Sequence, residues 1–71
     1  MAESVYKVIA LVGTSEESWE KAAATAIDQA AKTLRDIRVA RIIEQDIHIE
    51  PNKSHTYRVK MEVSFKYEGG D

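Results

Sequence analysis

The sequence of 71 residues contains no cysteine and only one proline. The absence of cysteine excludes a disulfide framework, a thiolate metal site and a cysteine nucleophile. The longest apolar run, Val8 to Val12, is too short to span a bilayer, so a cytoplasmic protein without a membrane partner is expected. Ten basic and twelve acidic residues are interspersed and give a net charge of −2, which indicates no nucleic-acid-binding surface.

The length of the chain predicts a single domain, 1–71, with a small core. A domain of this size buries only about 60% of its unfolded surface, and without disulfides or metal it commonly gains stability by oligomerising. The segment 5–12 is rich in β-branched residues and apolar at most positions, which predicts a strand that is covered on both faces. One of those covers is expected to be another copy of the chain.

An alanine-rich helix is predicted over residues 15–35. Thr14 and Glu17 have the spacing of a capping box, and Ser15 is an alternative cap one residue later. The apolar residues of this segment recur at steps of three and four, so they form one stripe that faces the sheet. The predicted stripe consists of Trp19, Ala23, Ala26, Ile27, Ala30 and Leu34.

Two further strands are predicted, over residues 37–50 and 56–68. The element order is then β-α-β-β, an α+β fold in which a three-stranded antiparallel sheet of order 1-3-2 wraps one long helix. In the segment 56–68, apolar and polar residues alternate clearly, so one face of that strand should meet the helix. Simple alternation in the segment 37–50 predicts one face with Ile37, Val39, Ile43, Ile47 and Ile49, and another with Arg38, Ala40, Ile42, Glu44, Asp46, His48 and Glu50.

No combination of nucleophile, base and acid occurs at a recognisable spacing, and no glycine-rich phosphate loop is present. His48 and Glu44 are the only candidates for acid or base chemistry. The sequence therefore favours a protein that is not an enzyme.

The carboxylates of Glu44, Asp46 and Glu50 are predicted to stand on one strand face, with neighbours along the row about 7 Å or more apart. That spacing is too wide for one ion to be chelated within a single chain, since calcium takes oxygens at roughly 2.3 to 2.6 Å. An ion site could form where a symmetry axis brings copies together. The alternative is a solvated face whose acids pair with Arg58, Lys60 and Lys66 of the neighbouring strand.

Several segments together resemble the dodecin family, from Val5 to about Tyr67. They are Val5-Tyr6-Lys7-Val8, the helix start Gly13-Thr14-Ser15, Ser18-Trp19-Glu20 with the alanine-rich helix, Thr56-Tyr57, and Val63-Ser64-Phe65. The resemblance implies a small β-α-β-β protein that assembles into a hollow homododecamer. It also implies binding of a flavin (FMN, FAD or riboflavin), which many dodecins hold in pairs.

The resemblance places a flavin-equivalent pocket at Val39, Arg41, Gln45 and Arg58. Flavin-binding members carry an aromatic residue, usually tryptophan, at the position of Val39, and a glutamine at the position of Arg58. Valine has no π-face to stack on a flavin ring, and stacking of this kind is worth roughly 1 to 3 kcal/mol by analogy with nucleobases. Arg58 instead offers a charged fork that suits a carboxylate or another anion.

Two hypotheses for the shell follow from the sequence. In the first, a non-enzymatic homododecamer binds, stores or sequesters a small ligand, which in the family is a flavin. In the second, the shell binds a divalent cation, calcium or magnesium, through Glu44, Asp46 and Glu50 at a junction between subunits, or it is purely structural.

Overall fold

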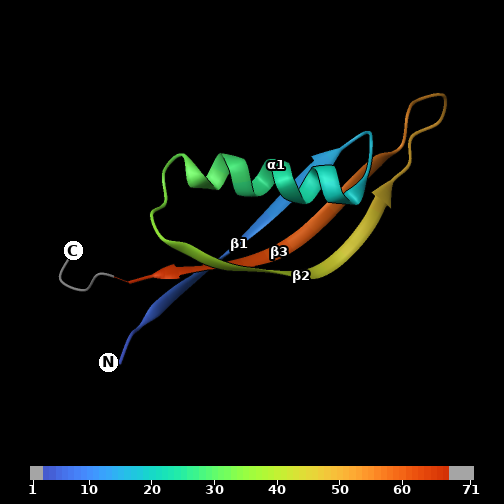
Figure 1. Cartoon of the computed structure of the whole chain (residues 1–71). Helices are drawn as coiled ribbons and strands as arrows, with labels where there is room; N and C mark the ends of the chain where they lie inside the picture. Colours follow the sequence, from blue (N-terminus) through green and yellow to red (C-terminus); the bar gives the residue numbers. More distant parts are fainter. Residues whose placement is uncertain (1–2, 68–71) are drawn as a thin grey trace.

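The structure is a computed structural model that describes residues 3–67 (Figure 1). A single helix, α1, crosses one face of a three-stranded sheet, and the chain is elongated, with extents of 54 × 21 × 18 Å. The central strand β3 pairs antiparallel with β1 on one side and with β2 on the other. The predicted α+β fold and the strand order 1-3-2 are therefore confirmed. The elements are β1 (Tyr6–Ser15), α1 (Trp19–Ala31), β2 (Ile37–His48) and β3 (Thr56–Lys66).

The predicted start of the helix is wrong, because β1 continues three residues further than expected. Gly13, Thr14 and Ser15 remain paired with β3, so Thr14 cannot cap a helix. The N-cap is Ser18, whose Oγ accepts a hydrogen bond from the backbone N–H of Lys21 at 3.0 Å. Sheet pairing has thus overridden the capping-box spacing.

The helix also ends earlier than predicted, at Ala31 instead of residue 35. The N–H groups of Thr33 and Leu34 both donate to the Ala30 carbonyl, which closes the last turn. Asp36 then adopts a positive φ of 58° and redirects the chain into β2. An αL residue of this kind ends helices and is tolerated best by glycine, asparagine and aspartate.

The core lies between α1 and the helix-facing side of β3. Val59, Met61 and Val63 are fully buried there, so the alternation predicted for this strand is confirmed. They pack against a stripe of small helix residues, of which Ala22 and Ala26 are the centre. The predicted helix stripe missed Ala22. Three residues predicted to lie on it, Trp19, Ala23 and Ile27, are only partly buried against the core.

Gly13 allows the helix to lie close to β1. A Cβ atom at this position would stand 2.1 Å from the backbone oxygen of Ala22 and 3.0 Å from the Cβ of Ala26. Both distances are below van der Waals contact, so only glycine fits without moving α1. The close approach is what lets a short helix of alanines cover the sheet.

The face assignment predicted for β2 is wrong, because the strand contains two irregularities. The register with β3 shifts between Ile37 and Val39 and again between Ile42 and Glu44. Each extra residue reverses the alternation of faces. Val39 therefore lies opposite Ser64 on the face away from α1, whereas Ile42 lies opposite the buried Met61.

The outer ends of the two long strands also differ from the predictions. The strand predicted over 37–50 ends at His48, and the one predicted over 56–68 ends at Lys66. Glu68 lies outside the described residues. Within those residues, α1 is neither long nor apolar enough to cross a membrane.

Candidate functional site

The face of the sheet that is turned away from α1, called the outer face below, carries both charged and apolar side chains. Residues of β3 that alternate with its buried core residues lie there, and their register partners in β1 and β2 share that face. Three of its valines are more than half exposed: Val8 at 57%, Val12 at 61% and Val39 at 59%. The outer face of the single chain is therefore uncovered, and the second cover predicted for β1, another copy of the chain, stays a prediction.

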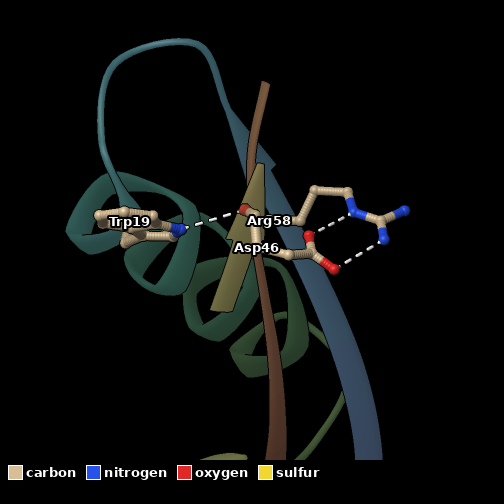
Figure 2. A network of polar contacts seen from close by, with 3 residues as sticks. All are labelled: Trp19, Asp46 and Arg58. Carbon is tan, nitrogen blue, oxygen red and sulfur yellow. Dashed lines mark hydrogen bonds and ion pairs between the residues drawn. The ribbon is translucent and has the colours of Figure 1, made fainter. Parts of the chain in front are cut away.

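Asp46 of β2 and Arg58 of β3 form a bidentate ion pair on the outer face (Figure 2). Arg58 Nε donates to one carboxylate oxygen at 2.7 Å and its second nitrogen donates to the other at 2.9 Å. The two residues are direct register partners, so the backbone places the fork opposite the carboxylate. These hydrogen bonds hold the pKa of the Asp46 carboxyl below its ordinary value and raise the pKa of Arg58.

Trp19 fixes the main chain of the same strand from the helix side. Its indole N–H donates to the Asp46 carbonyl oxygen at 3.1 Å, and its ring packs edge-on against Tyr57 at 5.1 Å between centroids. In Figure 2 the indole lies on one side of β2 and the Asp46 carboxylate on the other. The first residue of α1 is thereby joined to the strand that carries Asp46.

A shallow depression of about 100 Å³ surrounds the ion pair. Glu44 and Lys60 are register partners and line it together with Asp46, Arg58 and Val12. The depression therefore contains two carboxylates and two cationic groups beside one exposed valine. Its net charge is zero when all four groups are ionised.

The flavin-equivalent residues are not brought together within one chain. Val39 and Arg41 lie beside a second hollow of about 240 Å³, where an Arg41 nitrogen contacts a Glu62 carboxylate oxygen at 3.1 Å. Arg58 lies six residues along β3 from the partner of Val39, about 20 Å away at 3.3 Å per residue. Gln45 is opposite the buried Val59, and so belongs to the helix-facing side of the sheet.

Two of the three predicted metal ligands lie together and one does not. Glu44 and Asp46 line the same depression, whereas Glu50 follows the end of β2 in the hairpin turn. One Glu50 oxygen lies 3.4 Å from His48 Nε2 and the other lies 3.6 Å from Lys53 Nζ. Across residues 3–67, no group of three acidic or histidine side chains is placed to hold a metal ion.

Sequence reasoning named Arg58, Lys60 and Lys66 as partners of the acidic face. The first two lie there, but Lys66 lies at the other end of β3, and the other groups around the acids were missed. These are Val12 in the depression and the Trp19 indole behind it. The pairing of Asp46 with Arg58 could have been found from the turn, because both residues lie six positions from Asn52, the middle of the hairpin. The contribution of Trp19 had no signal in the sequence, since it depends on how far β1 extends before the helix.

Comparison with known proteins places this arrangement in a family. The family model described as Dodecin matches residues 5–68. The chain belongs to the dodecin family.

Two curated dodecins are similar to the chain over most of its length. Calcium dodecin from Mycobacterium tuberculosis is 57% identical over 63 residues, which cover 89% of this chain and 89% of that protein. Dodecin from Thermus thermophilus is 41% identical over 64 residues, which cover 90% of this chain and 93% of that protein.

The fold of the chain is also similar to that of a solved dodecin structure. A crystal structure of the M. tuberculosis calcium dodecin, described as a calcium-chelating antigen with a novel calcium-binding site, superposes with a TM-score of 0.86. It covers 96% of this chain and 97% of its own, at 53% identity.

Proposed function

We propose that this dodecin is a non-enzymatic protein that forms a hollow homododecamer and sequesters calcium at junctions between subunits. Glu44 and Asp46 supply the central carboxylates, and Glu50 from the overhanging hairpin of a neighbouring copy is a further ligand. The observation that carries the proposal is that Glu44 and Asp46 line one depression on an outer face that a second chain is needed to cover. The calcium-binding relative supports the choice of ion.

The need for other copies follows from the apolar surface of the single chain. Its buried hydrophobic core, within the described residues, is formed by three alanines, two valines and one methionine. By contrast, Val8, Val12 and Val39 are exposed on the outer face, and Ile49 is exposed at the hairpin. Covering such side chains is worth about 25 cal/mol per Å² of apolar surface, so assembly supplies stability that the small core lacks.

The need for more than one copy at the ion site follows from ligand counting. Calcium takes six to eight oxygens, and two carboxylates provide at most four. The described part of one chain gathers no third acidic or histidine ligand at this place. A site closed by symmetry-related carboxylates meets the requirement, and carboxylate oxygens are ligands that suit a hard cation.

Calcium is preferred over magnesium on the same chemistry. Magnesium demands near-ideal octahedral geometry and gives up its water reluctantly, whereas calcium accepts flexible carboxylate cages. Flavin binding is less well supported. The residue at the stacking position is Val39; Arg41 lies beside the same hollow, but Arg58 is distant along β3 and Gln45 lies on the opposite face.

A calcium titration of the assembled protein tests the proposal. Wild type is compared with Glu44→Gln and Asp46→Asn by calorimetry, with Asp28→Asn on the exposed side of α1 as the matched control. Each site variant should weaken binding about tenfold or more, because each removes one ligand charge, and the control should bind as wild type does. Equal binding by all four proteins would place calcium elsewhere, and displacement by equimolar magnesium would contradict the ion preference.

A further inference from the structure

We propose that Arg58 is a built-in competitor for the Asp46 carboxylate, so that a divalent cation binds at Asp46 only after displacing the guanidinium. This inference rests on the proposed function and adds a regulatory step to it. In the structure, the two oxygens that a cation would need each accept a hydrogen bond from Arg58, at 2.7 and 2.9 Å. The ion pair is thus an autoinhibitory contact at the centre of the site.

The competition is direct because both partners are cations that use the same atoms. A guanidinium at hydrogen-bond distance stands where a metal ion would have to approach the carboxylate, and its charge repels that ion. Both Asp46 carboxylate oxygens already accept a hydrogen bond from Arg58. An ion can therefore take both oxygens only after the guanidinium leaves.

The pair is placed where it can open. The side chains of Arg58 and Asp46 are 47% and 50% exposed, so water can replace the hydrogen bonds that are lost. Exposed pairs of this kind contribute little to stability and are screened by salt. A divalent ion that gains several oxygens can displace such a partner without unfolding the sheet.

The motion is confined to the Arg58 side chain. The main chain of Asp46 is held from behind by the Trp19 indole, and its position in the sheet is fixed by pairing with β3. Exchange of the guanidinium for an ion therefore requires rotation about the bonds of one long side chain. The carboxylate itself stays in place, as a site of defined geometry requires.

Lys60 is the matched control for Arg58. It lines the same depression, carries the same charge and lies opposite Glu44 in the register. Among the ion pairs of residues 3–67, none joins Lys60 to Glu44. Lys60 therefore contributes general positive charge to the site without occupying a carboxylate.

The experiment is a calcium titration of the assembled protein with wild type, Arg58→Gln and Lys60→Gln. Arg58→Gln should bind calcium about tenfold more tightly, because a competing unit charge a few ångströms from the ion is removed. Lys60→Gln should change the affinity by no more than about threefold, because a charge outside the contact is screened. The double variant Arg58→Gln with Asp46→Asn should lose this gain in calcium affinity, because the carboxylate for which Arg58 competes is absent.

Each result decides between the inference and the function on which it rests. If wild type binds calcium and both single variants gain affinity equally, the gain comes from the general loss of positive charge. The proposed role of Arg58 as a competitor is then wrong, while the proposed function stands. If only Arg58→Gln binds calcium, Arg58 does compete for the Asp46 carboxylate, and the proposed calcium-binding function of the native protein is wrong. If none of the proteins binds calcium, both ideas are overturned.

A charge-conserving variant covers the case in which Arg58→Gln fails to assemble. Arg58→Lys keeps the positive charge but cannot form the two-pronged contact. It should gain affinity by a smaller factor than the neutral variant, about threefold. No gain with Arg58→Lys in an intact assembly would then reject the competitor.

Discussion

Replacing Gly13 by alanine tests the packing that makes this fold feasible with so small a core. The added Cβ would lie 2.1 Å from the backbone oxygen of Ala22, which is more than 1 Å inside normal contact. Because that atom belongs to the helix backbone, no side-chain rotation can relieve the clash, and α1 must move away from β1. Overpacking of this kind costs about 1 to 3 kcal/mol, and a backbone clash belongs at the upper end.

A stabilising effect of alanine has to be subtracted from this cost of overpacking. Alanine lowers the conformational entropy of the unfolded chain relative to glycine, which stabilises a protein by about 0.4 to 1 kcal/mol where the backbone is compatible. The net expectation for Gly13→Ala is a loss of about 2 kcal/mol. For a domain of this size that corresponds to a decrease in Tm of roughly 10 °C.

Thermal unfolding of wild type and Gly13→Ala at matched chain concentration measures this loss, since stability of an oligomer depends on concentration. Thr14→Ala is the control, because it places alanine in the next position of β1 on the exposed side. A Gly13→Ala protein as stable as wild type would refute the close approach of the helix. Rescue by Ala26→Gly would show that the Cβ of Ala26, and not the Ala22 backbone oxygen, is the atom that obstructs alanine at position 13.

Three further predictions concern the buried core, the Trp19 hydrogen bond and the ion pair of Asp46 with Arg58. Met61→Ala should cost about 2 to 5 kcal/mol in chemical denaturation, because Met61 is fully buried between the sheet and the helix; a loss below 1 kcal/mol would contradict that burial. Trp19→Phe keeps a ring beside Tyr57 but removes the donor to Asp46, and should cost about 0.5 to 1.5 kcal/mol by the same assay. The Asp46 carboxyl should titrate by NMR below the ordinary aspartate pKa, and Arg58→Gln should return it toward that value. The folded-state pKa is depressed, so the stability from this pair is present above the unfolded-state pKa of about 3.9 and is lost as pH falls through the folded-state pKa; an unchanged pKa in the variant would disprove the pairing.

The sequence predicted the fold because its strongest patterns are long and local. The alternation in β3 from Tyr57 to Phe65 identified the central strand and its buried face without ambiguity. The order of one helix between strands then left few topologies. The same patterns located the polar outer face of β3, and with it Arg58 and Lys60.

The errors arose where tertiary pairing decides the outcome. The helix start was misplaced because pairing of Thr14 with β3 prevents it from capping. Val39 was assigned to the wrong face because strict alternation cannot foresee the two register shifts of β2. The four flavin-equivalent positions came from resemblance alone, and strand register separates Gln45 and Arg58 from Val39 and Arg41 within one chain.

The measurement that tests the central claim most directly is native mass spectrometry of the purified protein with and without calcium. The proposal predicts a species of about 96 kDa, twelve times the 8.0 kDa chain. Its mass should increase by whole calcium ions in wild type, and Glu44→Gln combined with Asp46→Asn should abolish that increase. A monomer or dimer alone, or a dodecamer whose excess mass is that of a flavin, would contradict the account.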